Sequence, residues 1–187
     1  MVILNKTILT SILIALVMII CFWMASFTLR SVLIFIPGVI ITFFFYLNTY
    51  DRKSDQAPQL LPWYLVALAI QLIHFTEEYS TDFVTRLPAI FGQAPYPLDY
   101  FVAFNMIAYS IFIIGGIALY LKAKAFLIIP LFFILIGVFF NGVAHVFLSI
   151  YVGGYFPGLY TALIYVGLGP FLILKIRSHV HLTQSTF

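Results

Sequence analysis

Two small groups of polar side chains stand out in this strongly apolar chain. The segment HFTEE places His74 three and four residues before Glu77 and Glu78, the only two glutamates, and Asn141 precedes His145 by four residues. Residues i, i+3 and i+4 share one face of an α-helix, so the members of each group can turn toward a common space.

The residue types suit two kinds of chemistry. Two imidazoles and two carboxylates make His74, Glu77, Glu78 and His145 candidate ligands for zinc, or for iron in a site of two histidines and one carboxylate. Asn141 would then orient one of these ligands. The metal-free alternative is general acid-base catalysis, in which a shared proton keeps one glutamate neutral and a histidine passes the proton on. We find no glycine-rich nucleotide loop, so neither chemistry calls for a nucleotide cofactor.

The composition places these residues in a membrane. Of 187 residues, 64% are hydrophobic and only 8% are charged, and the mean hydropathy is +1.13, which excludes a water-soluble globule. Backbone groups in lipid must bond internally, so we predict an all-α, polytopic membrane helix bundle forming one domain over residues 1–187. The net charge of +3 gives no indication of nucleic-acid binding.

Apolar runs and their polar, proline or glycine breaks predict six transmembrane helices. Their expected ranges are 8–29, 32–48, 61–79, 99–121, 125–149 and 157–176, with an outer loop at 80–98. That loop is long and rich in proline, and it is either a lid over the site or a surface linker.

Basic residues predict the orientation. One side collects Lys6, Arg52, Lys53, Lys122, Lys124, Lys175 and Arg177, whereas the other has Arg30 and Arg86. This asymmetry puts both termini in the cytoplasm, and we expect the chain in a bacterial inner (plasma) membrane. His179 and His181 then lie in a cytoplasmic tail, away from the site.

The predicted orientation brings the polar groups to one depth. At ~1.5 Å per residue, His74 to Glu78 lie roughly 18 to 24 Å along the third helix, which runs outward from Pro62. Asn141 and His145 fall in the outer half of the fifth helix. Asn105, on the fourth, lies about 9 Å below the outer surface.

Simpler interpretations exist for each group. The glutamates could end the third span at the headgroup boundary, although a helix C-terminus disfavours negative charge. Asn141 and His145 could be an interhelical hydrogen-bonding pair.

Tyr155, Pro157 and Gly158 precede the sixth helix. Pro157 and Gly158 fit a helix start and close packing, which we favour, and Tyr155 an interfacial anchor. The functional alternative is that the positive N-terminus of this helix faces an anionic group, either a lipid headgroup or the glutamate pair. On that alternative, Tyr155, Pro157 and Gly158, with Asn105, are candidate substrate-binding residues.

The three motifs H-x-x-E-E at 74–78, N-x-x-x-H at 141–145 and Y-x-P-G at 155–158 occur in this order. The set resembles the HXXEE family of integral membrane proteins, over roughly residues 60–175. The resemblance implies a bundle of membrane helices with the motif residues as the suspected active site. It supplies neither a reaction nor a ligand.

We therefore expect a membrane enzyme that acts on a lipid or other hydrophobic molecule entering from the outer leaflet. A metal-dependent hydrolase or oxidase and an acid-base isomerase both fit, with His74, Glu77, Glu78, Asn141 and His145 as catalytic residues. The alternative is a proton- or cation-coupled transporter or ion-binding module, which would need a polar path inward. Thr42 and Gln71 are the main candidates for that path.

Overall fold

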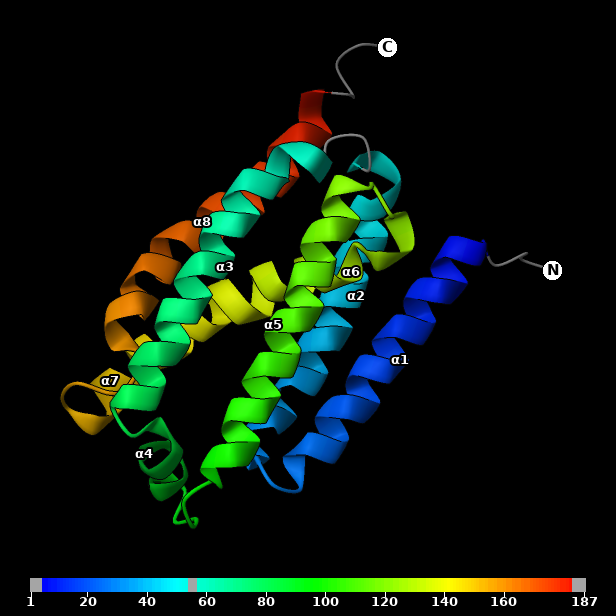
Figure 1. Ribbon diagram of the computed structural model, residues 1–187. Coiled ribbons are helices and arrows are strands. Elements are labelled where there is room, and N and C mark those ends of the chain that lie inside the picture. Colours follow the sequence, from blue (N-terminus) through cyan, green and yellow to red (C-terminus); the bar gives the residue numbers. More distant parts are fainter. Residues whose placement is uncertain (1–4, 54–56, 183–187) are drawn as a thin grey trace.

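The fold is a bundle of helices in which six are long and apolar enough to cross a membrane (Figure 1). The computed structural model describes residues 5–53 and 57–182, without the side chains of 50–53, 57–58 and 177–182. The six candidate spans are Lys6–Ser26, Arg30–Thr49, Gln59–Ser80, Leu98–Tyr120, Lys124–Val152 and Leu159–Ile176. No strand occurs in the described part of the chain, which confirms the all-α class.

The helices follow the predicted spans closely and add detail between them. They are α1 (Lys6–Ser26), η1 (Arg30–Ile34), α2 (Phe35–Lys53), α3 (Ala57–Ser80), α4 (Phe83–Ile90), α5 (Leu98–Tyr120), η3 (Lys124–Phe126), α6 (Ile128–Phe132), η4 (Phe133–Phe140), α7 (Asn141–Val152) and α8 (Leu159–Leu182). The fifth span, from η3 to α7, is the most buried. It therefore forms the centre against which the other helices pack.

The fifth span is not one regular α-helix. Its middle, η4, is π-helical, and it joins α6 to α7 directly before Asn141. A π-helical turn contains more residues than an α-helical turn, so it rotates everything that follows relative to what precedes. The π-helical segment therefore helps to set the direction in which α7 presents its polar residues.

The outer segment 80–98 is more ordered than the loop that we expected. It contains α4, whose Leu87 and Pro88 are buried. The Tyr96 N–H donates to the Val84 carbonyl at 2.9 Å, and the Tyr96 hydroxyl accepts from the Ser31 N–H at 3.1 Å. The apolar residues of the segment thus form a short helix packed on the lower end of the bundle in Figure 1.

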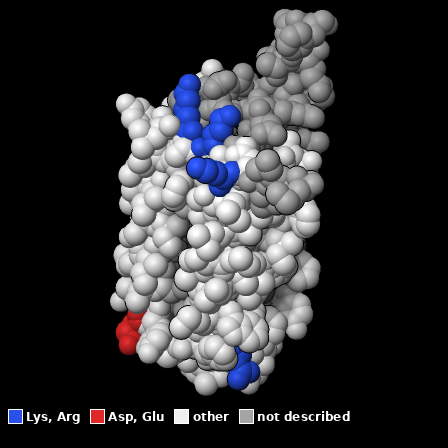
Figure 2. Space-filling view, turned by 90° about the vertical axis from the view of Figure 1, so that its right-hand side faces the viewer, with Lys and Arg blue, Asp and Glu red and all other residues white. Residues whose placement is uncertain are grey.

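Basic side chains lie mainly near one end of the bundle. In Figure 2 most of the visible Lys and Arg side chains gather at the upper end, and one lies at the lower end. In Figure 1 the upper end is where α3 begins and where α5 and α8 end. The side chains of Arg52, Lys53 and Arg177, which the charge count included, lie outside the described part, and the cytoplasmic orientation stays a prediction.

Candidate functional site

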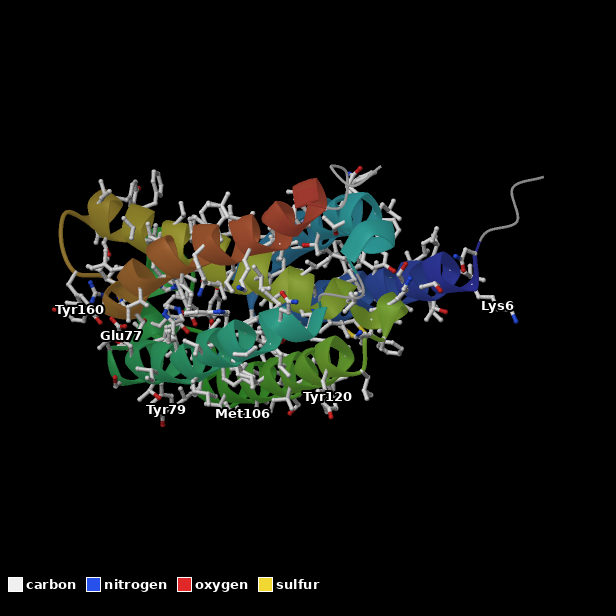
Figure 3. The ribbon with its side chains drawn as sticks, turned by 90° about the horizontal axis from the view of Figure 1, so that it is seen from above. Lys6, Glu77, Tyr79, Met106, Tyr120 and Tyr160 are labelled. Carbon is white, nitrogen blue, oxygen red and sulfur yellow. The ribbon has the colours of Figure 1, made fainter. Side chains whose placement is uncertain are left out.

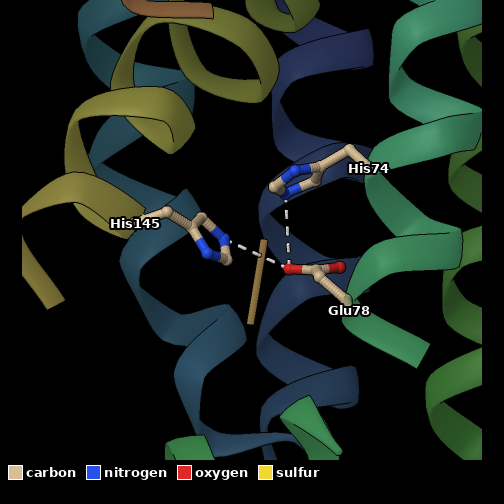
Figure 4. Close-up of side chains that lie close together, drawn as sticks. All are labelled: His74, Glu78 and His145. Carbon is tan, nitrogen blue, oxygen red and sulfur yellow. Dashed lines mark ion pairs between the residues drawn. The ribbon is translucent and has the colours of Figure 1, made fainter. Parts of the chain in front are cut away.

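Three side chains form a buried cluster between α3 and α7 (Figure 4). Glu78 Oε1 lies 3.4 Å from His74 Nε2 and 3.2 Å from His145 Nε2. The three ligand atoms all lie within 4.8 Å of one another. His74 is fully buried, and His145 and Glu78 nearly so, so the cluster is almost closed off from the exterior of the protein.

Close helix packing brings α7 and α8 together beside the cluster. A Cβ atom at Gly142 would stand 2.7 Å from the Tyr165 Cβ and 3.2 Å from the Ala162 carbonyl oxygen. Gly142 lies in the first turn of α7, three residues before His145. A side chain at this position would push α8 away, so the glycine permits the distance at which the site is assembled.

The hydrogen bonds of His145 define its proton arrangement. Its Nδ1 lies 2.6 Å from the Pro157 carbonyl oxygen. A carbonyl oxygen only accepts, so Nδ1 carries a proton and donates it. The other ring nitrogen, Nε2, is therefore the one that faces Glu78.

His74 is held from both sides of its ring. Its Nδ1 lies 2.7 Å from the Thr161 hydroxyl, and its Nε2 lies 2.9 Å from the Asn141 amide nitrogen. An amide N–H only donates, so Nε2 of His74 accepts and presents a lone pair. Both histidines thus direct Nε2 toward the same oxygen of Glu78.

Two of the three separations in the cluster fit the donor set of a transition-metal ion. Two ligand atoms bound at about 2.0 to 2.1 Å in a tetrahedral site lie roughly 3.3 to 3.4 Å apart. The two Nε2–Oε1 separations, 3.4 and 3.2 Å, come close to that value. Two imidazoles and one carboxylate are a ligand set typical of zinc or iron(II) with positions left for water or substrate.

The structure does not bring Glu77, our fourth candidate metal ligand, to this cluster. Its Oε2 accepts from the Thr161 N–H at 2.9 Å and from the Thr161 hydroxyl at 2.6 Å. Its Oε1 accepts from the Tyr160 N–H at 2.9 Å, and Figure 3 shows Glu77 and Tyr160 close together. Adjacent helical residues point about 100° apart, so the two glutamates serve different partners.

Glu77 belongs to α3, and its carboxylate lies at the N-terminus of α8, where free N–H groups and the helix dipole favour an anion. Of the anionic groups that we considered for this terminus, the structure places one member of the glutamate pair, Glu77, there. The Tyr155 hydroxyl adds a hydrogen bond to Glu77 Oε1 at 3.0 Å. Burial raises the pKa of Tyr155, as does the neighbouring Glu77 carboxylate, so the phenol stays protonated and keeps donating.

Position 158 requires a glycine for two reasons, its left-handed backbone and the close approach of both imidazoles. Its φ is +88°, and a Cβ atom there would stand 2.5 Å from His145 Nδ1 and 2.8 Å from His74 Cε1. Pro157 and Gly158 precede α8, which begins at Leu159, so Pro157 does not lie in the first turn as we expected. The Y-x-P-G segment instead forms a wall against both imidazoles.

An aromatic layer from α4 and residue 156 covers one side of the cluster. The Phe83 ring of α4 stacks on His145 with centroids 5.6 Å apart and meets Phe156 edge-on at 6.0 Å. Arg86 donates to the Tyr155 carbonyl at 2.7 Å and lies over the Phe156 ring. These contacts tie α4 to the wall formed by residues 155–158.

Other candidate residues have different places. The Asn105 amide donates to the Phe101 carbonyl of its own helix at 2.9 Å, and among the described contacts it has no hydrogen bond to the cluster. The tail side chains of His179 and His181 lie outside the described part.

Our reading of the sequence missed Thr161, which links His74 to Glu77. Its only signal was a hydroxyl one turn into an apolar helix, three residues after Gly158.

Together the fold and the cluster define a polytopic helical membrane protein with a buried His-Glu-His site. The chain belongs to a family described as proteins of unknown function with an HXXEE motif, whose model matches residues 65–173, more than half of the chain. The match covers the candidate ligands and Thr161, and it confirms the resemblance. No curated protein and no solved structure matches the chain.

Proposed function

We propose that this protein is a membrane enzyme that binds one divalent transition-metal ion, zinc or iron(II), at His74, Glu78 and His145. Its substrate is a lipid or another hydrophobic molecule that reaches the site from the outer leaflet of a bacterial plasma membrane. Bound zinc supplies Lewis acidity for hydrolysis, whereas iron(II) supplies oxidative chemistry.

One observation carries this proposal: three hydrogen-bond acceptor atoms, the two histidine Nε2 atoms and Glu78 Oε1, face one another. The Nδ1 atoms of both histidines have partners that leave Nε2 toward the ligand space, and each Nε2 faces Glu78 Oε1. Two imidazole lone pairs and a carboxylate oxygen repel one another unless a cation lies among them. Protons can meet this need, but a metal ion meets it for all three atoms at once.

The surrounding residues support the same assignment. The Pro157 carbonyl and the Thr161 hydroxyl orient the two rings from behind, as the hydrogen-bonding partners of metal-binding histidines do. The Asn141 amide donates to the Nε2 lone pair of His74, so it marks this nitrogen as the acceptor and would have to release it when a metal binds. The buried setting excludes water and strengthens the electrostatic effect of any charge inside.

The depth of the site supports a hydrophobic substrate. His74 and Glu78 lie in the last two turns of α3, inside a candidate membrane span. The outer surfaces of the neighbouring helices are apolar, with Ile150 and Tyr160 strongly exposed. A molecule soluble in the bilayer reaches such a site without crossing water.

Metal content of the purified protein tests the proposal. We expect near-stoichiometric zinc or iron, measured by inductively coupled plasma mass spectrometry on protein purified without a polyhistidine tag. The double variant His74→Ala/His145→Ala should lose the metal. The matched control is His179→Ala/His181→Ala, which removes the other two histidines and should keep it. Absence of metal from the wild type, even after incubation with zinc or anaerobic iron(II), would reject the metal site.

A proton- or cation-coupled transporter is the second candidate, and one observation favours it. Buried polar contacts continue inward from the cluster, because the Tyr165 ring lies 5.6 Å from His74 and its hydroxyl donates to Gln71 Oε1 at 2.8 Å. The Thr42 hydroxyl is also buried, with no partner among the described residues. Ion flux in proteoliposomes that disappears on Glu78→Gln would establish this function, and absence of flux from the wild type would exclude it.

A further inference from the structure

Thr161 sits at the junction between the two glutamates of the HXXEE motif. Its hydroxyl touches Glu77 Oε2 at 2.6 Å and His74 Nδ1 at 2.7 Å. His74 in turn reaches Glu78 through Nε2. Thr161 therefore connects the carboxylate at the N-terminus of α8 to the buried cluster through one imidazole ring.

The direction of these hydrogen bonds follows from the groups involved. The Thr161 hydroxyl has a single proton, and a carboxylate can only accept one. The short contact with Glu77 is charge-assisted, so it takes this proton in preference to the Gly158 carbonyl, which lies 3.2 Å away. The Thr161 oxygen is then an acceptor, and Nδ1 of His74 must donate to it.

We propose that Thr161 is a positioning residue that, together with Glu77, keeps His74 in the tautomer with its proton on Nδ1. Nε2 then carries the lone pair, which accepts from the Asn141 amide at 2.9 Å and lies beside Glu78. Pro157 does the same for His145 through a backbone carbonyl. The Thr161 hydroxyl of α8 thus accepts the Nδ1 proton of His74, and the Pro157 carbonyl before α8 accepts the Nδ1 proton of His145.

The arrangement also explains why two adjacent glutamates are needed. Glu78 belongs to the cluster, whereas Glu77 polarises the Thr161 hydroxyl and is itself fixed by the N–H groups of Tyr160 and Thr161. Without the Glu77 carboxylate, Thr161 would be free to donate to His74 and to stabilise the opposite tautomer. The hydrogen bonds at the start of α8 therefore influence which tautomer His74 adopts in the site.

The tautomer can be measured without any metal. Protein labelled with 15N-histidine is stripped with a chelator and studied in detergent at pH 8 by two-dimensional 15N–1H correlation of the imidazole rings. His74 is assigned with the variant His74→Gln. We expect the wild type to show an Nδ1–H tautomer at His74. Thr161→Val removes the acceptor at Nδ1 and leaves only the Asn141 amide to favour the Nδ1–H tautomer, so the fraction of the Nε2–H tautomer at His74 should rise. Thr161→Ser, which keeps the hydroxyl, should restore the wild-type spectrum.

Two results would overturn the proposal. They are an Nε2–H tautomer at His74 in the wild type, and an unchanged tautomer in Thr161→Val. If the valine variant fails to fold, Thr161→Ala removes the same hydroxyl in a smaller side chain, and the wild-type spectrum by itself still decides the first point. The spectrum of His145 serves as the internal control and should not change.

The effect on metal affinity rests on the proposed function and is measured separately. Zinc titration by calorimetry should show a Kd about 10- to 100-fold higher for Thr161→Val than for the wild type or Thr161→Ser. If no variant and no wild type binds zinc or iron(II), the proposed function fails while the tautomer result stands. If the wild type binds metal and Thr161→Val binds it equally well, the positioning role fails and the metal site stands.

Discussion

Gly158 lies so close to His145 that no other residue fits at its position. An added Cβ would stand 2.5 Å from Nδ1 of the ring, and the φ of +88° is itself unfavourable for residues with a side chain. Gly158 therefore lets the turn before α8 approach the imidazole closely enough for the preceding carbonyl to accept its proton.

Replacing this glycine should damage the site more than the fold. We expect Gly158→Ala to destabilise the protein by about 1 to 2 kcal/mol through the left-handed backbone, with roughly 1 to 3 kcal/mol more from overpacking, and to lower metal content sharply. Gly153→Ala is the matched control, because Gly153 also has a positive φ, +72°, but has nothing within 4 Å of the added Cβ. Thermal unfolding and metal content that are equal in the two variants would contradict this role.

The adjacent glutamates should separate cleanly by experiment. Glu78→Gln removes the carboxylate between the two histidines and should abolish metal binding with little loss of stability, because it also removes a nearly buried charge. Glu77→Gln places an amide N–H group among the N–H donors of Tyr160 and Thr161. It should lower the free energy of unfolding by about 1 to 3 kcal/mol.

Metal content and thermal unfolding of both variants, measured side by side, check this division. We expect Glu77→Gln to retain more metal than Glu78→Gln. The opposite order would mean that Glu77, and not Glu78, is the ligand.

Much of the fold was readable from hydropathy, because a lipid-facing helix must be apolar along its whole length. The span predicted at 99–121 is Leu98–Tyr120, and that at 61–79 is Gln59–Ser80. The sequence rules also brought His74, Glu78 and His145 to one depth, since they needed only the direction and rise of each helix.

The contacts of Glu77 and Thr161 depend on helix rotation, which hydropathy does not encode in a bundle apolar on most faces. The i, i+3 and i+4 rule placed Glu77 and Glu78 on one broad face, but a side chain at i+3 and one at i+4 diverge enough to reach different helices. The π-helical turn in η4 adds a rotation that no apolar pattern shows. The short helix α4 was hidden by Pro88 within it and by Pro95 and Pro97 after it, which suggested an irregular loop.

Arg86 should hold α4 in place over the site. Arg86→Met keeps the length of the side chain but removes the hydrogen bond to the Tyr155 carbonyl and the charge over Phe156. We expect a loss of about 1 to 3 kcal/mol locally, seen as faster amide hydrogen exchange in residues 83–90 and 153–158. Arg30→Met, at the other arginine on the predicted outer side, is the control and should leave both segments protected. Equal amide exchange in the two variants would show that Arg86 does not hold α4 against residues 155–158.

The approach of α7 to α8 should be sensitive to a single methyl group. Gly142→Ala would place a Cβ 2.7 Å from the Tyr165 Cβ and 3.2 Å from the Ala162 carbonyl, both on a helix that cannot yield without moving Thr161. Overpacking of this kind costs about 1 to 3 kcal/mol, and the displaced helix should also weaken metal binding, because Thr161 orients His74.

Gly167→Ala is the matched control on α8, since its Cβ would meet nothing within 4 Å and alanine favours a helix by up to about 1 kcal/mol. We therefore expect opposite shifts in the thermal midpoint, down for Gly142→Ala and unchanged or up for Gly167→Ala, with metal lost only in the first. A Gly142→Ala protein that keeps both its midpoint and its metal would mean that α7 and α8 are not in the close contact on which the site depends.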